Sequence, residues 1–243
     1  MNTILARIYS GYAGLMFMVS FLLFLPIILV CIWVPGWKKY GRKINRFWSR
    51  LYFILIFLPV KIKTEARIEK EKPYIFLANH FSYLDIPMMG FMPGDVLFVG
   101  KASLMNIPLF GYYFRNLHIT VNRDNLRSRA ETMKRVSVAL DSGSSVILFP
   151  EGGIFTQSPP AMIPFKNGAF RLALEKQIPI IPVTLSFNHL ILPDDGRLLL
   201  HWRQAKLVLH HAISAQVNDT ENTLKEKCFQ IIQQQLNHDH KKL

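Results

Sequence analysis

The longest feature of the hydrophobic pattern lies at the N-terminus, where 30 consecutive residues, 8–37, carry no charged side chain. About 20 apolar residues are enough to cross a bilayer as a helix, so this stretch predicts a membrane-associated helix, kinked at Pro26. A second apolar run, residues 51–60, is too short to span. It is typical of an interfacial or re-entrant segment, or of the first buried part of a globular domain. We therefore expect a membrane-associated helical anchor over residues 1–60 and an α/β domain over residues 61–243.

From residue 73 onwards, short apolar runs alternate with amphipathic stretches. Six of the runs are expected to be strands: 74–78, 96–99, 118–121, 146–149, 180–185 and 207–211. Helical spacing of apolar residues predicts a helix between Asp124 and Asp141, with Asp124 as its N-cap. A shorter helix is expected over 167–176 and a polar one over 221–236. Strands that alternate with helices predict an α/β fold with a largely parallel central sheet flanked by helices.

The charge of the chain points to an anionic partner and to a membrane. The formal net charge is +13, and residues 38–72 hold 11 of the 29 lysines and arginines. Basic charge beside an apolar segment favours anionic lipid headgroups over nucleic acid, for which the sequence shows no motif. Arg7 is the single basic residue on the other side of the segment, so the positive-inside rule predicts that the domain lies in the cytoplasm.

The first candidate for chemistry is the heptapeptide Asn79-His-Phe-Ser-Tyr-Leu-Asp85, directly after a predicted strand. If the chain turns before a helix begins, the Asp85 carboxylate can reach one ring nitrogen of His80. That contact would fix the tautomer and leave the other nitrogen free to accept a proton from a hydroxyl. Ser82 and Asp85 also match a capping box, so Asp85 could instead only cap a helix.

Three further segments place polar or basic groups near strand ends. Phe149-Pro-Glu-Gly-Gly153 follows a buried-looking strand, and glycines there permit close approach of an anion to backbone N–H groups. Arg123 ends a strand and suits a phosphate. Lys166 precedes a helix whose N-terminus favours anions. Taken singly, each has an ordinary alternative as a turn or as a solvated surface charge. His210, His211, His238 and His240 lack the companions that a metal site needs, so no metal is expected.

Taken together and in order, these segments resemble the glycerophospholipid acyltransferase family, and within it the bacterial 1-acyl-glycerol-3-phosphate acyltransferases. Four blocks carry the resemblance: Asn-His-x4-Asp at 79–85, a Gly…Arg block at 111–123, Phe-Pro-Glu-Gly at 149–152 and Ile-Pro-Val at 181–183.

The resemblance implies roles for the matching residues. His80 would act as general base and Asp85 would orient it, with no covalent acyl-enzyme. The acceptor would be bound by the following residues: Arg123, Glu151, Gly152, Lys101, Lys166 and Gly111. The family's third block usually continues with Thr-Arg, whereas this chain has Gly153 and Ile154. Lys166 or Arg171 would then compensate, or the acceptor would lack a phosphomonoester.

The resemblance therefore implies an acyl-thioester-dependent 1-acylglycerol-3-phosphate O-acyltransferase of phospholipid biosynthesis. The alternatives are an O-acyltransferase for a lyso-aminolipid, such as lyso-ornithine or lyso-glycine lipid, and a lipid hydrolase. No cofactor is expected beyond the donor substrate, acyl-CoA or acyl-ACP. The expected partners are a lysolipid acceptor, coenzyme A or acyl carrier protein, and anionic membrane lipids, at the cytoplasmic face of a bacterial inner membrane.

Overall fold

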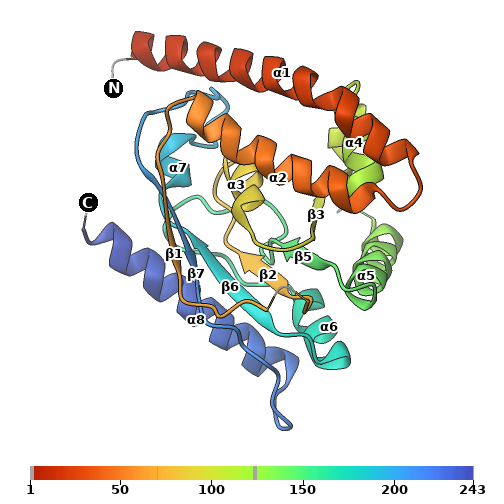
Figure 1. Cartoon of the computed structure of the whole chain (residues 1–243). Coiled ribbons are helices and arrows are strands. Elements are labelled where there is room, and N and C mark those ends of the chain that lie inside the picture. Colours follow the sequence, from red (N-terminus) through yellow and green to blue (C-terminus); the bar gives the residue numbers. More distant parts are fainter. Residues whose placement is uncertain (1–2, 70, 123–124, 243) are drawn as a thin grey trace.

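A seven-stranded sheet forms the centre of the computed structural model, which describes residues 3–69, 71–122 and 125–242 (Figure 1). The strands are β1 Val60–Thr64, β2 Ile75–Ala78, β3 Val96–Lys101, β4 Ile119–Val121, β5 Ser145–Leu148, β6 Ile180–Leu185 and β7 Ala205–Leu209. Their order is β1-β7-β6-β2-β5-β3-β4. Every neighbouring pair is parallel except β6 and β7, so the sheet is largely parallel, as predicted.

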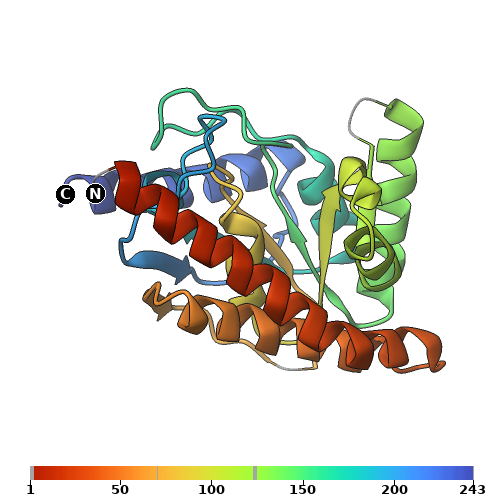
Figure 2. The ribbon, with the colours of Figure 1, turned by 90° about the horizontal axis from the view of Figure 1, so that it is seen from above.

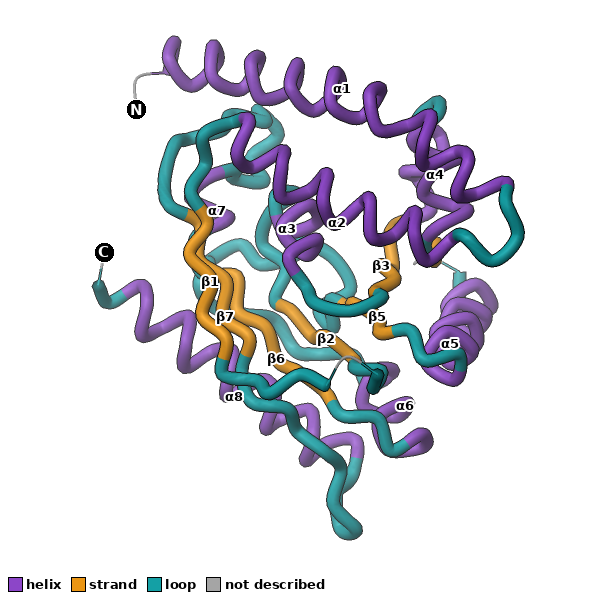
Figure 3. Tube along the Cα trace, in the orientation of Figure 1, coloured by secondary structure: helices purple, strands orange, loops and turns teal. Residues whose placement is uncertain are grey.

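Helices cover both faces of the sheet (Figure 3). They are α1 Thr3–Trp33, α2 Lys38–Leu55, α3 Asp85–Met88, α4 Phe110–Leu117, α5 Leu126–Asp141, α6 Gly168–Lys176, α7 Asn188–Ile191 and α8 Glu221–His240, with 3-10 helices at Met89–Phe91 and Ala102–Asn106. Helices α1, α2 and α4 pack on one face, and α5, α6 and α8 pack on the other. Strands β2, β5 and β6 are buried along their whole length, as is usual for parallel strands covered on both faces.

The N-terminal helices α1 and α2 lie side by side at one surface, shown in red and orange in Figure 2. Tyr9 and Tyr12 of α1 donate their hydroxyl protons to the carbonyl oxygens of Ile56 and Leu55, at 2.8 and 2.7 Å. Helix α1 is long and apolar enough to cross a membrane, and most of its large side chains outside this contact are exposed. The buried side of α1 packs into the core of the domain. The division of the chain at residue 60 stays a prediction.

Most of the predicted elements are found within two or three residues of their expected bounds, and several differences have clear physical reasons. The helix at 126–141 is capped by Asn125, whose side chain accepts the Ser128 N–H; Asp124, the predicted cap, lies outside the described residues. Helix α8 continues to His240, four residues beyond the predicted end. Residues 51–60 hold the end of α2, a short link and the first residue of β1, and Phe53, Ile56 and Leu58 among them are buried in the core.

Candidate active site

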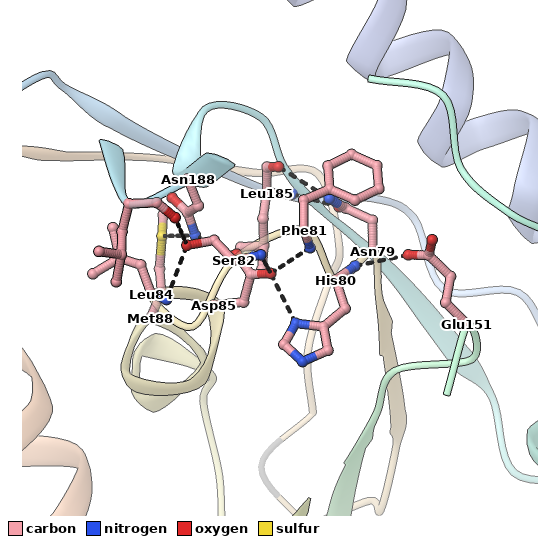
Figure 4. Close-up of polar contacts among 11 residues, drawn as sticks. Asn79, His80, Phe81, Ser82, Leu84, Asp85, Met88, Glu151, Leu185 and Asn188 are labelled. Atoms are coloured by element: carbon pink, nitrogen blue, oxygen red, sulfur yellow. Dashed lines mark hydrogen bonds and ion pairs between the residues drawn. The ribbon is translucent and has the colours of Figure 1, made fainter. Parts of the chain in front are cut away.

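The His80 ring and the Asp85 carboxylate meet at the carboxyl end of β2. Residues 79–84 form a turn and α3 begins at Asp85, which brings the carboxylate back towards the ring as the sequence predicted. The Nδ1–H of His80 donates to Asp85 Oδ2 at 2.9 Å (Figure 4). Because Asp85 is fully buried and His80 is 5% exposed, this tautomer is held in place. Its Nε2 is left as a proton acceptor, with no hydrogen bond to any residue that the structure describes.

Asp85 also closes the turn that carries His80. Its Oδ2 accepts the backbone N–H groups of Phe81 and Ser82 at 2.8 and 2.9 Å. The Ser82 hydroxyl accepts the Leu84 N–H at 3.1 Å and donates to the Leu192 carbonyl at 2.7 Å. Asp85 Oδ2 therefore both caps the turn and accepts the hydrogen bond of the imidazole, so both interpretations of Asp85 are correct.

The Phe-Pro-Glu-Gly segment after β5 supports His80 from the other side. Phe149 stacks on the imidazole with ring centroids 4.1 Å apart and planes at 19°. Glu151 accepts the backbone N–H of His80 at 2.8 Å and that of Ile163 at 3.3 Å. Burial raises the pKa of Glu151 to about 7, against the opposing effect of these two N–H donors. Glu151 is only 1% exposed and holds backbone rather than facing solvent, so its predicted contact with the acceptor stays a prediction.

Two asparagines complete the setting, and the sequence analysis assigned a role to neither. Asn79 donates to the Leu185 carbonyl at 3.1 Å and accepts the Leu185 N–H at 2.8 Å, which joins the ends of β2 and β6. Asn188, the first residue of α7, donates to Asp85 Oδ1 at 2.7 Å. It follows β6 by three residues, so a search for polar side chains just after every predicted strand would have found it.

The remaining predicted acceptor-binding residues occupy different surroundings. Arg123 lies outside the described residues. Lys101 is exposed at the carboxyl end of β3, the same edge that carries His80 on β2. Gly111 is buried in α4, where a Cβ would lie 2.3 Å from the Met105 carbonyl oxygen, so it serves close packing. That contact gives no support to its predicted role in substrate binding, which stays a prediction.

Lys166 stands beside the Phe-Pro-Glu-Gly turn. Gly152 has a φ of +81°, and a Cβ there would lie 2.2 Å from Lys166 Nζ. The backbone N–H of Lys166 donates to the Pro150 carbonyl at 2.9 Å, which fixes the two segments together. Arg171, the other candidate for replacing the missing arginine, instead pairs with Glu221 at 3.0 Å on the exposed side of α6. Of Lys166 and Arg171, it is therefore Lys166 that lies at the turn.

An apolar cavity of about 600 Å³ lies under the N-terminal helices. Its lining includes Phe17 of α1, Trp48 of α2, Tyr83 just before α3, Pro87 within α3, and Leu200. Tyr83 and Pro87 belong to the segment that also carries Asp85, so the cavity adjoins the turn that carries His80. A cavity of this size and character is typical of a site for a mostly hydrophobic ligand.

Comparison with known proteins places this geometry in a family. A model of the Acyltransferase family matches residues 59–186, which is more than half of the chain. A 1-acyl-sn-glycerol-3-phosphate acyltransferase of Chlamydomonas reinhardtii is 30% identical over 89% of this chain and 67% of its own length. One of Haemophilus influenzae is 30% identical over 70% of this chain and 73% of its own. A lyso-ornithine lipid O-acyltransferase of Rhizobium meliloti is 29% identical over 57% of this chain and 46% of its own.

A solved structure shares the fold over nearly the whole chain. The 1-acyl-sn-glycerophosphate acyltransferase PlsC of Thermotoga maritima superposes with a TM-score of 0.82, at 22% identity, over 98% of this chain and 97% of that one. The chain spans between 55% and 67% of the length of the algal and plant relatives. The matched segment, 59–186, contains the His80–Asp85 pair and the Phe-Pro-Glu-Gly turn. The chain belongs to the Acyltransferase family.

Proposed function

We propose that this protein transfers a fatty acyl group from an acyl thioester to the free hydroxyl of 1-acyl-glycerol-3-phosphate, giving phosphatidic acid for phospholipid synthesis. The observation that carries the proposal is the 2.9 Å contact between His80 Nδ1 and the buried Asp85 carboxylate, which leaves Nε2 as a base at the carboxyl edge of the sheet. Ligands of open parallel sheets bind outside this edge. The names of the algal and bacterial relatives support the same reaction.

The reaction needs one proton to move twice. His80 Nε2 takes the proton from the acceptor hydroxyl while the oxygen attacks the thioester carbonyl. The imidazolium that results is stabilised by Asp85 at Nδ1. When the tetrahedral intermediate collapses, the carbon–sulfur bond breaks and the leaving thiolate takes the proton from Nε2. The ester and the free thiol are the products, and His80 returns to its starting state. We expect no cofactor beyond the thioester donor, which is acyl-CoA or acyl-ACP.

Lys166 and the Gly152 turn are proposed to bind the phosphate of the acceptor. The ammonium lies against Gly152, whose lack of a side chain leaves room for it, and Lys166 is exposed to an incoming ligand. A cation here takes the place of the family arginine that Ile154 replaces. Lys101, at the carboxyl end of β3, is a further candidate for the same phosphate, as is Arg123, which lies outside the described residues.

Substitution of Lys166 tests this assignment. For Lys166→Ala we expect KM for 1-acyl-glycerol-3-phosphate to rise about 10-fold or more, because a charge-assisted hydrogen bond contributes roughly 1.5–3 kcal/mol. Arg171→Ala removes an equal charge from the same surface region and should leave KM unchanged. Equal effects of the two substitutions would argue against a phosphate site at the turn.

The apolar cavity and the N-terminal helices are proposed to serve the acyl chains and the membrane. Helix α1 contributes both to the cavity lining and to the exposed apolar surface, so a chain entering from the bilayer has a continuous apolar route. The basic residues of α2 suit anionic headgroups. We infer a location at the inner membrane of a bacterium, with the sheet on the cytoplasmic side.

A lyso-aminolipid is the second candidate acceptor. Ile154 at the position of the family arginine favours it, as does similarity to the lyso-ornithine lipid O-acyltransferase. Single-turnover acyl transfer by purified protein, with 1-acyl-glycerol-3-phosphate and lyso-ornithine lipid offered in parallel, separates the two. Transfer only to the lyso-ornithine lipid would overturn the proposed acceptor. Acyl release without any lysolipid would indicate a hydrolase, and activity that survives His80→Ala would overturn the mechanism.

A further inference from the structure

Asn188 makes the fourth hydrogen bond to the Asp85 carboxylate. Three donors converge on Oδ2: the His80 ring and the N–H groups of Phe81 and Ser82. The other oxygen, Oδ1, accepts the side-chain amide of Asn188 at 2.7 Å. Among the described residues this is the one hydrogen bond to Oδ1, and it comes from a different strand end than the other three.

The Asn188 side chain is buried and its orientation is fixed by chemistry. Asn188 is 1% exposed, and its amide nitrogen also contacts the Met88 sulfur at 3.2 Å. A carboxylate only accepts hydrogen bonds, so the amide nitrogen must face Asp85. The amide oxygen then has no partner within the described structure.

We propose that Asn188 is a positioning residue that fixes the rotation of the Asp85 carboxylate, so that Oδ2 stays aimed at His80 Nδ1 throughout acyl transfer. Without it, Oδ1 would be a buried anionic oxygen with no donor, and the carboxylate could turn about its Cβ–Cγ bond. Its tie to the ring would weaken at the moment when the imidazolium forms. This inference rests on the proposed function of His80 as a base.

The segment around Asn188 is tied to the turn of His80 by other hydrogen bonds as well. α7 is a short helix whose residues Asn188 and Ile191 are buried, and the carbonyl of Leu192 just beyond it accepts the Ser82 hydroxyl. Asn79 ties Leu185 at the end of β6 to β2. The turn of His80 is thus joined to the β6 edge at three points, and only Asn188 reaches the catalytic carboxylate.

Asn188→Asp provides a readout that packing alone cannot produce. The replacement has the same shape, and it sets a second carboxyl against Asp85. Like-charge repulsion keeps one proton on such a pair until the pH is well above the ordinary range for a carboxyl. With that proton the new side chain donates to Oδ1 as the amide did. Once the proton is lost, two carboxylates repel one another and Asp85 is displaced.

Other titratable groups surround the pair and must be controlled for. His80 and Glu151 lie on the β2 and β5 sides, and His189 follows Asn188 in the chain. His240 of α8 stacks on His189, and Arg203 also acts on it. All five are unchanged in Asn188→Leu, which removes the donor and adds no titratable group. The difference between the two pH profiles therefore isolates residue 188.

The experiment measures kcat and KM of purified wild type, Asn188→Leu and Asn188→Asp from about pH 6 to about pH 9, with melting temperatures at each pH. Asn188→Leu should lose about 10- to 100-fold in kcat at every pH with little change in KM. For Asn188→Asp, the ratio of its kcat to the wild-type kcat should fall at least 10-fold as the pH rises. Loss of activity in His80→Ala would establish separately that His80 is the base.

Three results would overturn the inference while the proposed function stands. The first is a kcat of Asn188→Leu within about threefold of wild type. The second is a ratio of the Asn188→Asp kcat to the wild-type kcat that stays constant across the pH range. The third is failure of Asn188→Asp to fold even at the acidic end, where its protonated side chain has the shape of the amide and can donate as the amide does. A wild-type protein inactive with every lysolipid would instead refute the proposed function.

Discussion

Asp85→Asn separates the charge of the carboxylate from its place in the turn. Three N–H groups converge on Oδ2 within 2.9 Å, so the oxygen of the new amide takes that position and its nitrogen turns towards Asn188. Asn188 can then rotate by half a turn and offer its own oxygen, which has no partner in the described structure of the wild type. The substitution therefore keeps the turn and removes only the negative charge.

The magnitude follows from the distance between the charges. An imidazolium and a carboxylate centred about 4 Å apart attract by about 4 kcal/mol at an effective dielectric constant of 20. Loss of that attraction in the transition state corresponds to about 10³ in rate, because each 1.36 kcal/mol is tenfold. The two backbone N–H groups already draw on the same charge, so we expect kcat to fall by about 10² to 10³ with KM nearly constant.

The assay is the initial rate of thiol release from an acyl thioester at saturating lysolipid, with melting temperature measured beside it. Ser82→Ala is the matched control, since it removes the hydroxyl that accepts from Leu84 and donates to Leu192 without touching the imidazole. The control should lower the melting temperature and leave kcat within about fivefold of wild type. A fall in kcat of less than about fivefold for Asp85→Asn would show that Asp85 is only a turn cap.

Three further outcomes are expected. In the wild type, burial raises the pKa of Glu151 from 4.5 to about 7, so the folded state holds the proton longer than the unfolded state does. The free energy of unfolding therefore falls by up to about 3 kcal/mol as pH rises between these values. Glu151→Gln should remove this loss, which the pH dependence of the melting temperature measures. Gly111→Ala should destabilise by about 1–3 kcal/mol, although alanine favours a helix, because its Cβ meets the Met105 carbonyl; an unchanged melting temperature would contradict this. Phe149→Leu should lower kcat by about 2- to 10-fold through loss of the stack on His80; wild-type kcat would show that the stack is dispensable.

The buried strands were predictable because their residues are apolar without interruption. Ile180–Leu185 is buried at every position, and the predicted and observed strands coincide. β1 was missed for the opposite reason. Val60–Thr64 is an edge strand that carries two lysines and is exposed beyond its first residue, which is how natural sheets protect an edge.

Helix α2 lies within the predicted helical segment 1–60, but the sequence did not mark it as a separate helix, because the side that it buries is not uniformly apolar. Gly41, Asn45 and Ser49 are buried on it beside Trp48 and Phe53. Asn45 accepts a hydrogen bond from the Tyr113 hydroxyl at 2.5 Å, so its burial depends on a partner distant in the sequence and not on the spacing of apolar residues along the helix. In the sequence, the basic first half and the apolar second half of α2 look like two separate segments, whereas in the structure they form one helix.

The site itself was predictable only as far as it is local. His80, Asp85 and the turn between them lie within one heptapeptide, and that contact was expected from the sequence. Glu151 reaches His80 across 71 residues, and Asn188 reaches Asp85 across 103. Such contacts depend on the order β6-β2-β5, which chain order does not reveal.

That order also explains why the segments that follow β2, β5 and β6 are needed together. The segment after β2 carries His80 and Asp85, and the segment after β5 carries Phe149 and Glu151, which both contact His80. The segment after β6 carries Asn188, whose amide donates to Asp85. Asn79 forms both hydrogen bonds with Leu185 at the point where β2 and β6 end, 106 residues apart, so it aligns the two strands beside the site. A slip of one residue between these strands would turn every side chain to the opposite face and separate Asn188 from Asp85. The catalytic geometry therefore exists only when the central sheet is correctly aligned.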